Sequence, residues 1–295
     1  MSKVPDTGQP VLLFAEESIR GTLREENQVS VLHISIAMGE LLIVADGMSG
    51  NTRGSTASRM VVEHFCEYLA SLPGDFPAGI AIREAATRAN EKIFAAIQAP
   101  YPHVGSTVVV ALVQQVADGT FAWIGHIGDS RAYLVRAGRL YRLTTDHTAV
   151  QDLLSRGLIT PEEAPHHPDA SVLTRSLGRQ PEVEIDIEQH ALAVNDTLLL
   201  CSDGLWAFVP EQEIQNIIDN SSFTVKTAAH KLLKQALAVG GDDNVGLEIV
   251  RLIQPPDLPV QKKESYVAIK VVLVMLLLAF ATVCVLGYLL LFTGN

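Results

Sequence analysis

Apolar and polar residues alternate along the chain in a pattern that mixes strands with helices. Short runs rich in Val, Ile and Leu, bounded by turn residues, are typical of strands. Such runs lie at residues 11–15, 29–37, 41–45, 107–115, 119–126, 131–136, 139–143, 183–187, 197–201 and 245–252. Sheets therefore account for much of the expected structure.

Two pairs of segments have the spacing of amphipathic helices. In the first pair, apolar residues recur at every fourth position over residues 57–69 and along a stripe over residues 82–97. The second pair covers residues 210–218 and 225–239, and a loop-rich helical segment covers residues 146–178. Consecutive strands beside paired helices predict an α+β fold, a β-sandwich with helices packed outside.

The last part of the chain has a different pattern. Residues 271–292 form a run of 22 residues without a charge. As a helix this run would be about 33 Å long, which matches a bilayer core of about 30 Å. A buried core helix is the alternative, but uncharged runs of this length favour a membrane span. We therefore expect a transmembrane tail anchor at residues 266–295.

The residues before the uncharged run indicate its orientation. Lys262, Lys263 and Lys270 precede the run and nothing basic follows it, so the positive-inside rule places the preceding domain in the cytoplasm. Simple solubility of a linker is the alternative explanation for these lysines. Prolines within residues 254–265 predict a stiff, extended linker, which leaves residues 1–253 as the folded domain.

Composition excludes several classes of protein. The chain has 295 residues, of which 48% are hydrophobic and 19% are charged, so most of it is not disordered. A net charge of -11 argues against nucleic-acid binding, because phosphates would be repelled, and it is compatible with cation binding. The three cysteines lie far apart, which suggests neither a zinc site nor a disulfide framework.

Acidic residues stand at the ends of three apolar strands. Asp46 follows the run 41–45, Asp203 follows the run 198–202, and Asp243 precedes the last strand. A carboxylate beside a buried strand is costly unless it is paired or binds a cation. Several carboxylates without Cys or His form an all-oxygen site suited to Mg²⁺ or Mn²⁺. Ordinary Asp-Gly turns are the alternative explanation.

The turn Asp129-Ser130 suggests a serine hydrolase as another alternative. Ser130 would be the nucleophile, with Asp146 and His147 as its partners. That arrangement needs the serine between a strand and a helix. Residues 131–136 instead continue a strand pattern, so the alternative is disfavoured.

Eight short motifs occur in an order that resembles the metal-dependent PPM (type 2C) serine/threonine protein phosphatases, in their bacterial branch. The motifs are REENQ (24–28), VADGMSG (44–50), GST (105–107), IGDSRAYLVRAG (127–138), LTTDH (143–147), LTRSLG (173–178), LLCSDGLW (199–206) and GDDNV (241–245). The resemblance covers residues 11–252. Each motif is weak by itself, and the specificity lies in the order of all eight.

The resemblance implies a fold and a metal centre. The fold is a β-sandwich of two antiparallel sheets flanked by helix pairs, to which this chain adds one C-terminal transmembrane helix. By the family's pattern, Asp46 bridges two Mn²⁺ or Mg²⁺ ions and the Gly47 carbonyl holds one of them. Asp203 and Asp243 hold the other ion, and Asp129 matches a position linked with a third, weaker ion.

The resemblance also implies an activity, the hydrolysis of phosphoserine and phosphothreonine in proteins by a metal-activated water. The implied catalytic residues are Arg24, Asp46, Asp203 and Asp243. Arg24 matches the arginine that binds the substrate phosphate, although its position alone fits an ion pair with a neighbouring glutamate. Residues 146–178 match a mobile flap beside the active site.

The chain departs from the family's pattern near the metal centre. The acid that usually follows Asn27-Gln28 is Val29 here, and two other common positions hold Ile19 and Asn51. Loss of the acid removes a negative charge that acts through water. Because the direct carboxylates are intact, we expect an active enzyme. The alternative is a pseudophosphatase, a phosphoprotein-binding module with a weakened metal site.

The expected partners and location follow from this function and from the apolar tail. The partners are phosphorylated Ser/Thr proteins, substrates of a cognate kinase, and the lipid bilayer, with no nucleic acid. The expected location is a bacterial cell membrane, crossed once, with the catalytic domain on the cytoplasmic side.

Overall fold

The structure is a computed structural model, and it describes residues 10–48, 53–97, 104–220 and 222–254. Contacts divide the chain into two units, and the helices and strands described below belong to the unit Pro10–Ile253. The predicted span at residues 271–292 lies outside the described residues. Within the described ranges, no helix is long and apolar enough to cross a membrane.

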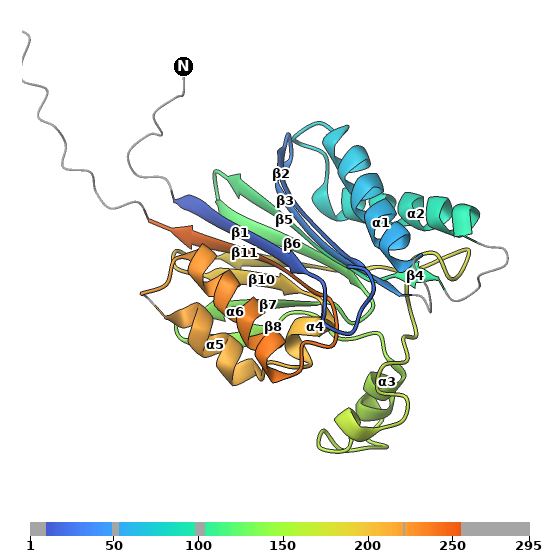
Figure 1. Cartoon of the computed structure of the whole chain (residues 1–295). Helices are drawn as coiled ribbons and strands as arrows, with labels where there is room; N and C mark the ends of the chain where they lie inside the picture. Colours follow the sequence, from blue (N-terminus) through green and yellow to red (C-terminus); the bar gives the residue numbers. More distant parts are fainter. Residues whose placement is uncertain (1–9, 49–52, 98–103, 221, 255–295) are drawn as a thin grey trace, which may run out of the picture. The chain divides into compact units, whose positions relative to one another are not determined.

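Two antiparallel sheets form the centre of this unit (Figure 1). The first sheet contains, in spatial order, β1 (Val11–Ile19), β11 (Val245–Ile253), β10 (Thr197–Cys201), β7 (Arg131–Arg136) and β8 (Arg139–Arg142). The second contains β2 (Val29–Ile36), β3 (Gly39–Met48), β5 (Val108–Val116), β6 (Gly119–Ile127) and β9 (Asp186–Leu192). The short strand β4 (Gly105–Ser106) pairs with the end of β3.

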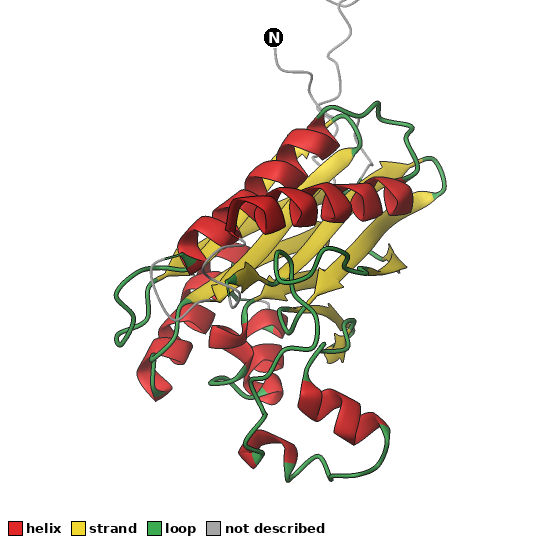
Figure 2. Cartoon of the chain, turned by 90° about the vertical axis from the view of Figure 1, so that its right-hand side faces the viewer, coloured by secondary structure: helices red, strands yellow, loops and turns green. Residues whose placement is uncertain are grey.

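Two helix pairs cover the outer faces of the sheets (Figure 2). The pair α1 (Gly54–Ala70) and α2 (Ala78–Ile97) packs on the second sheet. The pair α5 (Glu211–Asp219) and α6 (Val225–Val239) packs on the first. The predicted β-sandwich with outer helix pairs is therefore confirmed.

The remaining elements differ more from the sequence prediction. Within the predicted helical segment, the structure has α3 (Ala149–Ser155) and the 3₁₀ turn η1 (Ala164–His166). The four-residue helix α4 (Asp203–Trp206) was not predicted, because it is too short to show a periodicity. The strand predicted at residues 183–187 is wrong in its bounds, since β9 starts at Asp186. Ile185 is apolar because it packs in the core under the first helix pair, not because it pairs in the sheet.

Both faces of β3 are covered, which explains its continuous apolar sequence. Leu41 and Ile43 pack with the helices α1 and α2, whereas Leu42 and Val44 pack in the layer between the sheets. All four side chains are fully buried, and burial of each stabilises the fold by about 2 kcal/mol. The strand therefore reaches the site at Asp46 with core packing on both of its faces.

One carboxylate lies inside the sandwich rather than at its end. Glu248 on β11 is fully buried, and neither of its carboxylate oxygens has a hydrogen-bond partner among the described residues. Glu16 on β1 is its partner in the strand register. Burial, with a smaller contribution from Glu16, raises the pKa of Glu248 to about 9. Glu248 is therefore protonated at neutral pH.

Replacement of this residue, Glu248→Gln, should stabilise the protein increasingly as the pH rises. Between the ordinary carboxyl pKa and about 9, the native Glu248 keeps a proton that the unfolded chain releases. The free energy of unfolding of the parent therefore falls by about 1.4 kcal/mol per pH unit from this one group. Urea unfolding at pH 5, 7 and 9 should show the variant's advantage growing with pH.

The matched control is Glu91→Gln on the exposed face of α2. Its difference from the parent should stay constant over the same pH range. A constant difference for Glu248→Gln as well would mean that Glu248 ionises normally in the folded state.

Candidate active site

The carboxylates meet in a cavity of about 180 Å³ between the ends of the two sheets. The cavity is lined by Arg24, Gln28, Asp46, Gly47, Met48, Thr107, Asp129, Ser171, Leu173, Asp203 and Asp243. All six site residues predicted from the sequence are in this set. They come from the end of β3, the turn before β7, the start of α4 and the loops that flank β1 and β11.

Asp46 is fixed through its main chain. Its N–H donates to Thr107 Oγ1 over 3.1 Å, and its carbonyl accepts from the Thr107 N–H over 2.8 Å. The Ser106 hydroxyl donates to the same carbonyl over 3.0 Å. These bonds tie β3 to the start of β5, so the Asp46 carboxylate stays directed at the cavity.

The glycines after the two strand-end aspartates permit close backbone approaches. A Cβ at Gly47 would lie 1.9 Å from the Gly54 carbonyl oxygen, and a Cβ at Gly204 would lie 2.1 Å from the Asn244 carbonyl oxygen. Neither contact is sterically possible, so each position requires glycine. At Gly204, this close packing brings the loop that carries Asp243 against the start of α4 and places two carboxylates at one site.

The carboxylates are buried or half-buried and repel one another. Burial raises the pKa of Asp46, and repulsion from Asp203 raises it further. Burial also raises the pKa of Asp203, with Asp243 adding to the effect, and it raises that of Asp129, with Asp203 adding to the effect. Among the described residues, the buried atom Asp203 Oδ1 has no hydrogen-bond partner. Such a cluster needs positive charge.

Arg24 supplies part of that charge from the rim. Its Nε and Nη2 atoms donate to the two carboxylate oxygens of Asp243 over 2.8 and 2.6 Å. This contact joins residues 219 positions apart, so the alternative of a local pair with a neighbouring glutamate is wrong. The Arg24 side chain is 47% exposed, which leaves its remaining N–H groups open to a ligand.

The turn that carries Asp129 is held from two sides. Trp206 Nε1 donates to the Asp129 carbonyl over 3.0 Å. The guanidinium of Arg131 stacks 3.4 Å above the Trp206 ring centre and forms a buried ion pair with Asp146 at 2.7 Å. The position of the turn therefore depends on α4, which carries Trp206, and on Asp146 at the start of the segment 146–178.

The same contacts exclude the serine hydrolase. The Ser130 hydroxyl bonds to Thr107 Oγ1 at 2.7 Å, and Asp146 is occupied by Arg131. His147 Nδ1 accepts from the Gly128 N–H over 3.2 Å, and its Nε2 faces Asp186. Serine, histidine and aspartate thus bond to other residues and form no triad.

A second group of possible metal ligands was not predicted. His126, His147 and Asp186 lie together, from three distant parts of the sequence. The two imidazole rings stack at 4.6 Å, and His126 Nε2 lies 2.8 Å from the Thr145 carbonyl oxygen. Arg175 Nη1 already lies 2.8 Å from Asp186 Oδ1 and 3.3 Å from His147 Nε2. We therefore interpret this group as an anchor for Arg175.

Val29 lies beside the site without lining it. It is 5% exposed and packs in the apolar layer between the sheets, against Gly246 and Val31. In the strand register it is the direct partner of Asp46. A carboxylate at this position would thus stand next to Asp46, as the sequence comparison with the family implied, but the valine itself contributes to the core.

The donor set fits divalent cations. Among the described residues it consists of carboxylates and main-chain carbonyls, and no cysteine or histidine of that part of the chain lines the cavity. Hard ions of the Mg²⁺ and Mn²⁺ type prefer such oxygen ligands. The unpartnered Asp203 Oδ1 is an available ligand atom. Fold and site together define a two-sheet sandwich with an acidic, cation-binding cavity between its sheets.

The chain belongs to the protein phosphatase 2C family, because the profile of that family matches residues 27–238. Among curated relatives, the serine/threonine protein phosphatase PstP of Mycobacterium tuberculosis is 37% identical over 248 residues, which cover 82% of this chain and 45% of PstP. The serine/threonine phosphatase stp of Listeria monocytogenes is 35% identical over 216 residues, covering 71% of this chain and 83% of stp. The chain thus spans about half the length of the mycobacterial relative.

Solved structures have the same fold. The catalytic domain of PstP in complex with two manganese ions is 33% identical, with a TM-score of 0.72 over 83% of this chain and 100% of that one. The serine/threonine phosphatase of S. agalactiae is 28% identical, with a TM-score of 0.76 over 82% of this chain and 99% of that one.

Removal of one site carboxylate, Asp203→Asn, should stabilise the metal-free protein and weaken its response to metal. The amide carries no charge to repel Asp46 and Asp243, so the melting temperature in EDTA should rise by about 2–6 °C, for a gain of roughly 1–2 kcal/mol. Added Mn²⁺ should raise the melting temperature of the parent more than that of the variant. Thermal melts with EDTA and with Mn²⁺ measure both effects.

Asp118→Asn, in the exposed turn before β6, is the control and should behave like the parent. If Mn²⁺ raises the melting temperatures of the parent and of Asp203→Asn equally, Asp203 is not a ligand of the metal.

Proposed function

We propose that this protein is a Mn²⁺- or Mg²⁺-dependent phosphatase that hydrolyses phosphoserine and phosphothreonine in proteins. The observation that carries the proposal is the acidic cavity itself, where Asp46, Asp129, Asp203 and Asp243 converge below Arg24. The family relationship and the names of the relatives support the same activity. The manganese ions in the related catalytic domain support the choice of metal.

The site residues divide into metal ligands and a substrate clamp. Asp46 and the Gly47 carbonyl would hold one ion. Asp203 and Asp243 would hold the second, with Asp46 shared between the two ions. Asp129 would hold a third. The chemistry supplied by the bound ions is a lower pKa for a water between them and neutralisation of phosphoryl charge. The chain supplies their ligands and keeps them in a fixed geometry.

Arg24 would bind the substrate phosphate from the rim. Its guanidinium already makes two parallel hydrogen bonds to a carboxylate, the geometry that also fits a phosphoryl group. Because it is half exposed, it can exchange one oxyanion partner for another at small cost. The active enzyme is favoured over a pseudophosphatase, since the ligand set is complete despite Val29 and the relatives are named as phosphatases.

We further propose a location at a bacterial cell membrane, with the catalytic unit on the cytoplasmic side. The uncharged run at residues 271–292 and the lysines before it support this location. The substrates would be phosphoproteins modified by a cognate kinase at that membrane.

The activity is tested with p-nitrophenyl phosphate and a phosphothreonine peptide. Hydrolysis should require Mn²⁺ or Mg²⁺ and stop in EDTA. Arg24→Ala should raise KM for both substrates by about 10-fold, more than it lowers kcat, if the arginine binds ground state and transition state alike. Steady-state kinetics over a range of substrate concentrations separates the two constants.

Arg83→Ala on the exposed face of α2 is the control and should match the parent. Absence of metal-dependent hydrolysis in the folded parent would overturn the proposed activity. An unchanged KM in Arg24→Ala would overturn the role of Arg24 alone.

The tail is tested by deletion of residues 266–295. The shortened protein should leave the membrane fraction and keep its metal-dependent activity, because Pro10–Ile253 contains the complete core and the site. Membrane fractionation and p-nitrophenyl phosphate hydrolysis are measured for both lengths. A full-length chain that is already free of membranes would contradict the anchor.

A further inference from the structure

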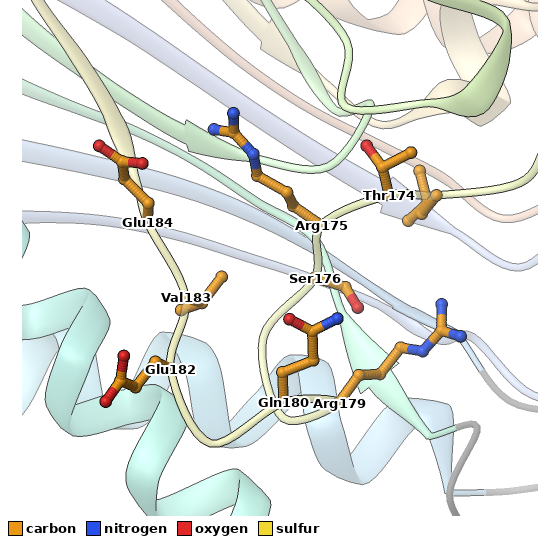
Figure 3. A pocket seen from close by; sticks show the side chains of 9 residues that line it. Thr174, Arg175, Ser176, Arg179, Gln180, Glu182, Val183 and Glu184 are labelled. Carbon is orange, nitrogen blue, oxygen red and sulfur yellow. The ribbon is translucent and has the colours of Figure 1, made fainter. Parts of the chain in front are cut away.

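A second pocket, of about 220 Å³, adjoins the acidic cavity. One continuous stretch of chain supplies its lining: Leu173, Thr174, Arg175, Ser176, Arg179, Gln180, Glu182, Val183 and Glu184 (Figure 3). Leu173 lines both hollows, so the two share a wall. We call this second hollow the flank pocket. If a molecule binds in the acidic cavity, the part of it that extends past Leu173 would lie close to the flank pocket.

The flank pocket contains hydrogen-bond donors that the protein does not use. Ser176 is 4% exposed, and its hydroxyl oxygen has no hydrogen-bond partner among the described residues. A buried hydroxyl without a partner costs about 1–3 kcal/mol. Arg179 is exposed, and it has no ion pair or hydrogen bond within the described part of the chain. A ligand would therefore not have to displace a protein partner from either group.

Arg175 adds a guanidinium whose position is fixed. Its Nη1 atom donates to Asp186 Oδ1 over 2.8 Å and lies 3.3 Å from His147 Nε2. The other N–H groups of this arginine are not used by these contacts. Arg175 is therefore held in advance, which lowers the entropy lost when a ligand binds.

The backbone of the flank pocket is tied to the acidic cavity. Leu177 exchanges two main-chain hydrogen bonds with Ser106, at 3.0 and 2.9 Å, and Ser106 is the strand partner of Gly47. Gly178, with a φ of 83°, donates its N–H to Asn90 Oδ1 over 2.8 Å. These hydrogen bonds connect the wall of the flank pocket to the strand that carries Gly47.

The flank pocket is lined by two arginines and two glutamates. Glu182 and Glu184 are part of the lining, but in Figure 3 their carboxylates point outward, whereas Val183 and the Gln180 amide point inward. The Ser176 hydroxyl points toward the side that carries Gln180 and Arg179. Figure 3 shows the Arg175 and Arg179 guanidiniums pointing in different directions, so a negatively charged group would bind one of them at a time, Arg179 being the one without a carboxylate partner among the described residues.

We propose that the flank pocket is a substrate subsite for an acidic side chain near the phosphorylated residue. The group bound is a carboxylate or a second phosphoryl group, since both accept hydrogen bonds from arginine in the same geometry. The proposal rests on the proposed phosphatase activity for its substrate. It assigns sequence selectivity to residues 175–180, outside the metal ligands.

The test compares phosphothreonine peptides of one length in the Mn²⁺-loaded full chain. One peptide has neutral Gln flanks, and a set places one Glu at each position from two to five residues on either side. A third set replaces Glu by a phosphonate analogue of phosphoserine, which is not hydrolysed and distinguishes the two anionic groups. The readout is the ratio of kcat/KM for each acidic peptide to that of the neutral peptide.

At one or more positions the ratio should be about 5, the upper range for an exposed ion pair. In Arg179→Ala it should fall toward 1, and in Ser176→Ala it should fall while the melting temperature rises, because the substitution removes a buried hydroxyl that has no partner. The control is Arg139→Ala on β8, in the sheet that contains β1 and β11. This variant should give the same ratio as the parent. A ratio within one variant is insensitive to any general loss of activity.

Binding of the same labelled peptides in EDTA, followed by fluorescence anisotropy, separates the two proposals. Preference for acidic peptides in the parent, lost in Arg179→Ala, supports the subsite even if no peptide is hydrolysed. Hydrolysis and binding that are equal for neutral and acidic peptides overturn the subsite and leave the phosphatase intact. A preference that survives unchanged in both Arg179→Ala and Ser176→Ala also overturns it.

Discussion

Repulsion among closely spaced, buried and half-buried carboxylates is the constraint on which the rest of this structure depends. Asp46, Asp203 and Asp243 enter one cavity from three strand ends, together with Asp129 from a turn. The apolar layers behind them prevent the strands from moving apart, since β3 is buried on both faces. The protein therefore stores a local destabilisation that a cation can relieve, and the folding energy of the sandwich offsets it.

The surroundings of the cavity keep the carboxylates in place against this repulsion. Thr107 and Ser106 hold the main chain of Asp46, and Trp206 holds that of Asp129. Arg131 stacks on Trp206 and forms an ion pair with Asp146, so it connects α4 to the start of the segment 146–178. The acidic cavity and the start of the segment 146–178 are thus parts of one connected structure.

The sequence predicts the sandwich and the acidic residues that line one cavity, for physical reasons. Strands covered on both faces have continuous apolar runs, and an Asp-Gly pair directly after such a run is conspicuous, as at Asp46 and Asp203. Contacts between distant residues leave no local pattern. The pairing of Arg24 with Asp243 and the anchor of Arg175 could be found only in three dimensions.

Other features have sequences that mislead. Ile185 has the composition of a strand residue but packs from a loop. Val29 stands where an acid is expected and instead fills the layer between the sheets. Glu248 lies in an apolar strand pattern in which a charged residue would normally face water, yet it is fully buried. In each case burial, not local propensity, decides the outcome.

The central claim, that the acidic cavity is a metal centre, is tested most directly by counting bound Mn²⁺. Equilibrium dialysis, with free Mn²⁺ followed by electron paramagnetic resonance, gives the number of ions per chain. The account predicts at least two ions for the parent and fewer for Asp46→Asn, whose side chain would be shared between two ions. A folded parent that binds no Mn²⁺, or an unchanged count in Asp46→Asn, would contradict it.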